Sequence, residues 1–296
     1  MNKKFYLGSH VSMNAKNDYL IGSAKETISN NANTLMFFTG APQNMIRKSV
    51  EELNVSEFQK ILQENDIDIK KVICHGPYIM NLANTIKQET FQFSVRFLKE
   101  ELQRLELIGV HTVIIHPGSA VGLDRTAALE NIAKGINLVY EELPNSPVKI
   151  ALETMSGKGN EVCINFTEIK FVLDRIKRKE MLGVCFDTCH MHDSGYDIKN
   201  NFEEVMDEFN KLIGLEKLFA IHLNDSKNPI NSHKDRHQNI GYGYIGFKAL
   251  ANIVHDIRFK EIPIILETPW INEKVSPYKA EIEMLEKNEF KDNFNI

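Results

Sequence analysis

Six short apolar runs of the chain each carry a histidine or an acidic residue at their end. The six side chains are His75, His116, Glu153, Asp187, His222 and Glu267. Imidazole and carboxylate groups are common protein ligands of divalent metals, and one ion takes three or four of them. Six such groups at the ends of similar segments therefore predict a site that holds more than one metal ion.

Further candidate ligands lie close to these six in the sequence. His190 follows Asp187 by three residues, so the two side chains would share a face if a helix begins there. Asp235 and His237 are two residues apart, and an extended segment would point both to one side. The set of nine suits two or three ions with bridging carboxylates. Because it lacks thiolates, it favours zinc or manganese over an iron–sulfur cluster.

The spacing of the apolar runs indicates how they are arranged. Gaps of 34 to 45 residues separate the six ligands, the length of a parallel strand, a return helix and two loops. Two more apolar runs precede them, and the first contains His10. Amphipathic segments such as 88–108 fill the gaps. The eight expected strands are 5–11, 34–39, 71–76, 112–118, 149–154, 182–188, 218–225 and 262–268.

Eight strands alternating with helices favour a (β/α)8 TIM barrel, because an open sheet would spread its strand ends along a line. Residues two apart in a strand share a face, so residues two before the ligands should fill the barrel interior. These residues are all apolar or small, as required: Ile73, Ile114, Ala151, Cys185, Ala220 and Ile265. We therefore predict one domain over 1–296, with the metal site at the C-terminal mouth of the strands. The segment 226–246 is expected to be an active-site loop.

Composition narrows the classes of protein that fit. The chain has 296 residues, 43% hydrophobic and 25% charged, as in globular proteins with a large core. A net charge of −5 disfavours nonspecific coating of nucleic acid, although bound cations would add local positive charge to an enzyme. The start lacks a secretory signal and no apolar run reaches membrane-spanning length, so we expect a cytoplasmic protein without a membrane partner.

Two sequence features argue against other cofactors. The four cysteines form no CxxC pair, which fits a reducing compartment. The run from Gly241 to Gly246 matches GxGxxG but does not follow a strand that opens a β-α-β unit. We therefore expect a loop there and no nucleotide cofactor.

Several motifs together resemble the endonuclease IV family of zinc-dependent apurinic/apyrimidinic endonucleases. The resemblance extends from GSHVS near the start to the last ILET, and the family fold is a (β/α)8 barrel. The motifs that carry it are HPGS (116–119), VCFDTCH (184–190), HLND (222–225), DRH (235–237) and ILET (265–268).

The resemblance implies three zinc ions per chain, with manganese possible at one position. It assigns His75, His116 and bridging Glu153 to the first ion, Glu153, Asp187, His222 and Glu267 to the second, and His190, Asp235 and His237 to the third.

The resemblance also implies a partner, double-stranded DNA that contains abasic sites. Tyr78 and Ile79 fall in a loop, HGPYIMN, that would enter the DNA at the lesion, and Asn81 ends that loop. Gln43 stands where some members have an arginine, and Ala120 where a histidine is common. The expected DNA-binding residues are His10, Gln43, Tyr78, Ile79, Asn81 and Arg236.

The hypothesis that follows is a DNA-repair hydrolase, expected to act as a monomer. A hydroxide held between the first two zinc ions, near catalytic Glu153, would attack the phosphodiester 5′ to the abasic site. The third ion would stabilise the departing oxygen. The products would be a 3′-hydroxyl and a 5′-deoxyribose phosphate. Extruding an abasic nucleotide costs less than extruding an intact one, which provides selectivity.

Three other interpretations remain open. A sugar isomerase or epimerase on a similar barrel would need one or two ions, so the DRH motif separates it from the nuclease. A non-catalytic damage-binding module would use zinc only to shape its surface. A structural barrel would use the ions only to hold its segments together.

Overall fold

A computed structural model describes residues 5–121 and 124–294 of the chain. Eight parallel strands close into a barrel in the order β1-β10-β7-β6-β5-β4-β3-β2, which confirms the predicted (β/α)8 fold. Each strand of the barrel pairs with its neighbours in parallel register. The strands are β1 Tyr6–His10, β2 Thr34–Phe37, β3 Ile73–His75, β4 Thr112–Ile115, β5 Lys149–Glu153, β6 Leu182–Asp187, β7 Leu218–His222 and β10 Pro263–Leu266.

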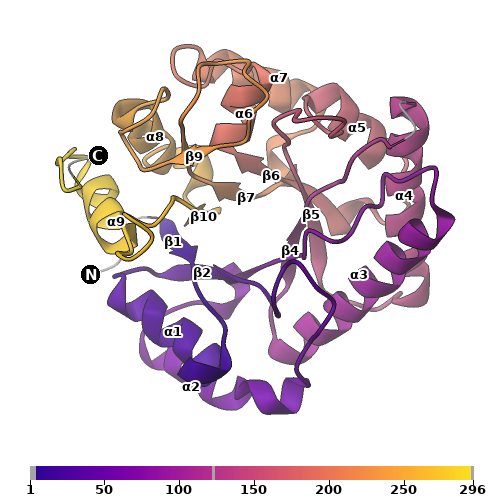
Figure 1. The fold of residues 1–296 in the computed structure, drawn as a ribbon, viewed down its shortest axis with the longest axis horizontal. Coiled ribbons are helices and arrows are strands. Elements are labelled where there is room, and N and C mark those ends of the chain that lie inside the picture. Colours follow the sequence, from indigo (N-terminus) through magenta and orange to yellow (C-terminus); the bar gives the residue numbers. More distant parts are fainter. Residues whose placement is uncertain (1–4, 122–123, 295–296) are drawn as a thin grey trace.

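Helices surround the strands, as Figure 1 shows, and each crossover returns the chain to the start of the next strand. Within the described part of the chain, no helix is long and apolar enough to cross a membrane. The helices are α1 Leu20–Ser29, α2 Val55–Glu64, α3 Gln88–Ile108, α4 Arg125–Glu142, α5 Phe166–Asp174, α6 Thr188–Ser194, α7 Phe202–Leu212, α8 Phe247–Val254 and α9 Tyr278–Lys287.

Local sequence signals set several helix ends. The side chains of Asp124 and Asn165 accept hydrogen bonds from the first turns of α4 and α5. Gly109 ends α3 in the left-handed conformation, with φ of 87°. The short helix α6 begins directly after β6, because the Asp187 carboxylate accepts a hydrogen bond from the His190 N–H at 2.7 Å.

The strands end earlier than the apolar runs predict. β4 ends at Ile115, and Pro117, which has no N–H for a ladder, follows two residues later. β10 ends at Leu266, since the Glu267 N–H is donated to the side chain of Asn224 at 3.0 Å. Two of the six candidate ligands, His116 and Glu267, therefore lie just beyond a strand.

The barrel interior is filled as predicted. The six residues two before the ligands form one buried cluster, which Met36 of β2 completes. Met36 was outside the prediction because β2 carries no candidate ligand from which to count. The interior side chains are Met36, Ile73, Ile114, Ala151, Cys185, Ala220 and Ile265, all 0% exposed.

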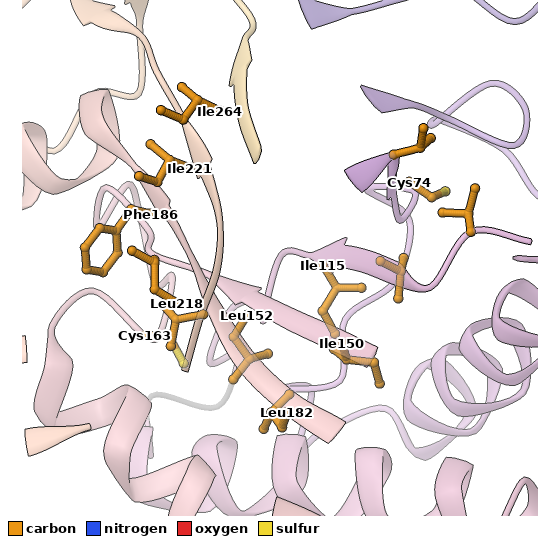
Figure 2. Packing of buried hydrophobic residues seen from close by; sticks show 14 of the residues in the cluster. Cys74, Ile115, Ile150, Leu152, Cys163, Leu182, Phe186, Leu218, Ile221 and Ile264 are labelled. Atoms are coloured by element: carbon orange, nitrogen blue, oxygen red, sulfur yellow. The ribbon is translucent and has the colours of Figure 1, made fainter. Parts of the chain in front are cut away.

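The alternate residues of the same strands face outward and form a second buried layer. In β5, Ile150 and Leu152 belong to this outer layer, whereas Ala151 between them belongs to the interior cluster. Figure 2 shows part of the outer layer, including Leu182 and Phe186 of β6. The strands are therefore buried on both faces, which is why they read as continuous apolar runs.

The segment after β7 is more ordered than a plain loop. Its ends pair as a two-stranded antiparallel ribbon of β8 (Asp225–Ser226) and β9 (His237–Gln238), which the sequence did not indicate. The glycine-rich run beyond β9 wraps around the Asp225 carboxylate, which accepts hydrogen bonds from the N–H groups of Gly241, Gly243, Ile245 and Gly246. These backbone N–H groups already bind a protein carboxylate and are therefore not free to bind the phosphate of a nucleotide.

Replacing Ile114 by alanine should test how tightly the interior is packed. Ile114 is fully buried, so the cavity should lower the free energy of unfolding by about 2–5 kcal/mol. Ile86→Ala is the control, because Ile86 is 65% exposed and should cost about 0.5 kcal/mol or less. Urea unfolding followed by circular dichroism measures both, and equal costs would contradict a filled interior.

Candidate metal centre

The nine candidate ligands lie together at the C-terminal mouth of the barrel. Seven of them line one cavity of about 300 Å³, namely His75, His116, Glu153, His190, Asp235, His237 and Glu267. Asp187 and His222 lie beneath it and are 0% exposed. Tyr78 and Glu161 complete the lining. Residues that are up to 192 positions apart in the sequence therefore share one pocket.

Glu153 lies at the centre of the group and uses its two oxygens in different directions. Its Oε2 is 3.1 Å from Nε2 of His75 and 3.1 Å from Nε2 of His116. Its Oε1 is 3.1 Å from Nδ1 of His222 and 3.4 Å from Nδ1 of His190. One carboxylate that faces two sets of imidazoles has the geometry of a bridging ligand.

A second cluster extends from Glu153 across the barrel axis. Nδ1 of His222 is 3.0 Å from Oε2 of Glu267 and 3.9 Å from Oδ2 of Asp187. One ligand atom from each of Glu153, Asp187, His222 and Glu267 lies within 4.8 Å of the others. This spacing suits four ligands around one ion.

The third cluster joins helix α6 to the ribbon segment. Nε2 of His190 is 3.0 Å from Oδ1 of Asp235, and Nε2 of His237 is 3.8 Å from the same oxygen. Asp235 has a left-handed backbone, with φ of 55°, so the expectation of an extended segment is wrong at this residue. His237 is also 3.6 Å from Oδ2 of Asp187, which places the second and third clusters side by side.

Backbone carbonyls fix which nitrogen of two histidines, His75 and His190, can bind a cation. In His75, Nδ1 is 2.7 Å from the Gly76 carbonyl oxygen. In His190, Nδ1 is 3.0 Å from the Thr154 carbonyl oxygen. A carbonyl only accepts, so Nδ1 carries the proton and Nε2 is directed at a carboxylate. Among the described residues, nothing forms a hydrogen bond with the buried Nε2 of His237. Lone pairs that face carboxylate oxygens fit a divalent cation between them.

Opposite charges within the site shift the pKa values of its carboxylates. Burial opposes ionisation of Glu153, but the charges of His222 and His116 hold its pKa well below the ordinary value. Burial likewise opposes ionisation of Asp235, yet the hydrogen bond and charge of His190 lower its pKa to about 2. The carboxylates therefore remain ionised and attract positive charge, whether from imidazolium or from metal.

The thiol of Cys189 also approaches the site, in a group with Asp187 and His237. Burial, and then the charge of Asp187, raise the pKa of Cys189 far above its ordinary range. A thiol that stays protonated is a poor metal ligand, which agrees with the choice of imidazole and carboxylate ligands from the sequence.

Several supporting residues were missed by sequence reasoning. Asn224 donates a hydrogen bond from Nδ2 to Oδ2 of Asp187 at 2.8 Å and accepts one from the Glu267 N–H. The Thr154 hydroxyl accepts a hydrogen bond from the Asp187 N–H at 2.9 Å. Both residues are buried and directly follow or neighbour a ligand-bearing strand end. The HLND motif contains Asn224, but its partner 37 residues away is not apparent from sequence.

Three of the expected DNA-binding residues lie on the rim of the cavity or outside it. Tyr78 is 49% exposed, and its ring centroid is 5.0 Å from that of His116. Gln43 and Arg236 are exposed, and Arg236 donates from Nη1 to the Asp235 carbonyl at 3.1 Å. Tyr78 therefore lines the cavity, and all three side chains are exposed to solvent.

The other three residues are more enclosed. His10 ends β1 and packs edge-on against Phe38, with ring centroids 5.1 Å apart. Ile79 is half-buried and packs against the main hydrophobic core. Asn81 uses its side chain to accept from the Ser119 N–H at 3.1 Å and to donate to the Ser119 carbonyl at 3.2 Å, so it joins two loops of the mouth. Ala120, next to that contact, is buried.

The fold and the clustered site place the chain in a known class. Residues 26–288 match the family model described as a xylose isomerase-like TIM barrel, and the chain belongs to that family. More narrowly, it belongs to the endonuclease 4 family. It is 50% identical to a probable endonuclease 4 of Pediococcus pentosaceus, over 97% of this chain and 96% of that protein. The predicted resemblance, and with it an enzyme of the endonuclease type, is confirmed.

Solved structures give the same result. The crystal structure of endonuclease IV from Thermus thermophilus aligns with a TM-score of 0.80 and 25% identity, covering 95% of this chain and 98% of that one. A D-tagatose 3-epimerase-like protein aligns with a TM-score of 0.69 and 17% identity, covering 95% and 96%. The second likeness shows the fold alone, which is the barrel that the sugar-isomerase alternative shares.

Removal of metal should make stability depend on pH in a defined direction. Burial favours the neutral form of His116 and His190. Nearby carboxylates outweigh burial and raise the pKa values of both residues. Their stabilisation is present below about pH 6.5 and is lost as pH rises through the folded pKa. The lowered carboxylate pKa values stabilise the fold above about pH 4.3. Metal-free protein should therefore melt at a lower temperature at pH 9 than at pH 6.

Thermal unfolding followed by circular dichroism in a chelating buffer measures this effect. Zinc should restore stability most at high pH, where the imidazoles are neutral and free to bind. His111→Gln is the control and should keep the pH dependence, because His111 precedes β4 at the opposite end of the barrel. A melting temperature of the metal-free protein that rises from pH 6 to pH 9 would contradict the assignment of these ion pairs.

Proposed function

We propose that the protein is an apurinic/apyrimidinic endonuclease that hydrolyses the phosphodiester 5′ to an abasic site in double-stranded DNA. The observation that carries the proposal is the joining of three clusters of imidazoles and carboxylates, through Glu153 and Asp187, at one barrel mouth. The relatives' name, probable endonuclease 4, supports a nuclease. A sugar epimerase would need at most two ions and leaves the third cluster unexplained.

Three zinc ions fit the ligands. His75, His116 and Glu153 would hold the first, with Glu153 shared by the second, which Asp187, His222 and Glu267 complete. His190, Asp235 and His237 would hold the third. When bound, clustered zinc ions supply the positive charge that stabilises the attacking, non-bridging and leaving oxygens of a phosphodiester.

The residues of the chain prepare the site for that chemistry. Glu153 keeps the first two clusters in register because its carboxylate is 1% exposed and faces imidazoles on both sides. The carbonyls of Gly76 and Thr154 hold His75 and His190 in one tautomer and orientation. The site therefore needs little reorganisation when the substrate arrives, which is the condition for strong electrostatic catalysis.

Selectivity for abasic positions follows from the depth of the site. The phosphate must reach ligands at the bottom of a cavity of about 300 Å³, which a nucleotide can do only when it leaves the base stack. An abasic nucleotide lacks stacking and pairing, so it leaves at lower cost. Tyr78 on the rim and exposed Arg236 would contact the duplex and its phosphates.

The proposed reaction leaves a 3′-hydroxyl and a 5′-deoxyribose phosphate. The mouth is complete within one chain, since all nine ligands come from it, and we propose a monomer that works on DNA in the cytoplasm.

Replacing Glu153 by glutamine should abolish nicking of a duplex with one synthetic abasic position. The amide keeps the shape but removes the charge and one of the two oxygens that face the clusters, so we expect a loss on the order of 10³ in kcat/KM and less bound zinc. A gel-based nicking assay and metal analysis measure both. Glu130→Gln, an exposed position on α4, is the control and should keep full activity.

The wild-type assay needs two further readings. EDTA should stop nicking and added zinc should restore it, with about three zinc ions per chain. A folded Glu153→Gln variant that nicks at the wild-type rate would end the assignment. One ion per chain, together with turnover of a ketose and no nicking, would support the sugar epimerase instead.

Replacing Tyr78 by alanine should weaken DNA binding without changing the metal content. An aromatic ring that stacks on nucleic acid contributes roughly 1–3 kcal/mol, so KM for the abasic duplex should rise about tenfold. Leu107→Ala is the control, because Leu107 is 64% exposed near the end of α3, away from the mouth. An unchanged KM with Tyr78→Ala would exclude the ring from the DNA contact.

A further inference from the structure

Helix α6 carries a second acidic residue that the proposed chemistry does not use. Asp193 lies three residues after His190 and is 0% exposed. A buried carboxylate needs strong hydrogen-bond partners. Its partners all come from the segment that begins at β8 and contains Asp235.

Each oxygen of Asp193 holds a different part of that segment. Oδ1 accepts a hydrogen bond from the Ser226 hydroxyl at 2.7 Å. Oδ2 accepts one from the Asp235 N–H at 2.9 Å and one from the Lys234 N–H at 3.3 Å. A single side chain on α6 therefore binds the backbone of a candidate ligand for the third ion, while His190 of the same helix faces that ligand's carboxylate.

The segment depends on such contacts because its own backbone is irregular. Asn231, His233 and Asp235 all have positive φ, at 63°, 54° and 55°. L-residues adopt this conformation only when the surroundings hold it. A chain that alternates in this way cannot form a regular ladder, so its N–H groups need partners elsewhere.

Those partners lie on the last turn of α6. The His233 N–H is donated to the Asp193 carbonyl at 3.0 Å, and the Asn231 N–H to the His192 carbonyl at 3.0 Å. The His192 ring bonds through Nε2 to the Asn228 carbonyl at 3.1 Å. Of these contacts, only the Asp193 carboxylate reaches Asp235 itself.

We propose that Asp193 is a positioning residue for the third zinc ion. It fixes the left-handed backbone of Asp235 and thereby brings the Asp235 carboxylate and His237 to His190. The first two clusters draw their ligands from strand ends or from the residue directly after a strand, which the sheet holds in place without Asp193. The inference rests on the proposed three-ion site and states which part of it one side chain controls.

Asp193→Ala tests the proposal through metal content rather than activity. Removing the carboxylate leaves the Lys234 and Asp235 N–H groups without their acceptor, so the segment should relax and the third zinc site should lose affinity by about 10–100-fold. Zinc per chain is measured after equilibration with a graded chelator, with circular dichroism to verify the fold. We expect two ions to be retained as in the wild type and the third to be lost at lower chelator concentration.

Two more variants separate positioning from general destabilisation. Glu101→Ala removes another buried carboxylate, which bonds Arg47 and Thr39 far from the third cluster, and should retain all three ions. Asp193→Asn keeps one acceptor oxygen for three donors, the Ser226 hydroxyl and the N–H groups of Lys234 and Asp235. Its third ion should therefore be lost at an intermediate chelator concentration. If Asp193→Ala does not fold, Asp193→Asn decides the question.

The proposal would be overturned if Asp193→Ala lost the third ion only at the chelator concentration that removes it from the wild type. If only Asp193→Asn folds, the same result with that variant would overturn it. Simultaneous loss of all three ions by the folded variant would also overturn it, because the effect would not be local. The outcome is distinct from a failure of the proposed function. A wild-type protein that binds three ions but does not nick abasic DNA would refute the function and leave the role of Asp193 standing.

Discussion

The arrangement of the mouth depends on the shared use of one buried carboxylate. Glu153 is 1% exposed, and its two oxygens face imidazoles from β3, the β4 loop, β7 and α6. A buried charge is tolerated only when it is compensated, so each of these segments must arrive in the correct register. The barrel meets this condition because Glu153 ends β5 two residues after Ala151, which is buried in the packed interior.

Rigidity around the site comes from a layer of residues that touch the ligands without belonging to them. Asn224 and Thr154 hold Asp187 and Glu267, backbone carbonyls orient His75 and His190, and Asp193 holds the segment of Asp235. The sheet also fixes the backbone of the ligands that end its strands. Asp235, in the irregular segment between β8 and β9, is not held by the barrel sheet, and the buried carboxylate of α6 is directed at its backbone.

The sequence predicted the positions of side chains correctly where the two-residue alternation of a strand fixes them. Because side chains alternate in a strand, counting two residues back from each ligand gave the interior residues, including Ala151 and Cys185. Strand ends, the β8–β9 ribbon and the left-handed Asp235 were not predictable, since each depends on contacts with distant residues. The support from Asn224 and Asp193 was missed for the same reason: their partners are 37 and 42 residues away.

The order of the strands has a consequence for biosynthesis. β10, near the end of the chain, lies between β1 and β7, so the cylinder stays open until residues 263–266 have left the ribosome. Glu267 follows immediately, and Asp235 and His237 are also late. A nascent or truncated polypeptide that lacks β10 and Glu267 therefore lacks both the closed barrel and the complete set of nine side chains. We therefore expect the complete set of nine side chains to capture metal only as a late step of maturation, after the last barrel strand has been translated.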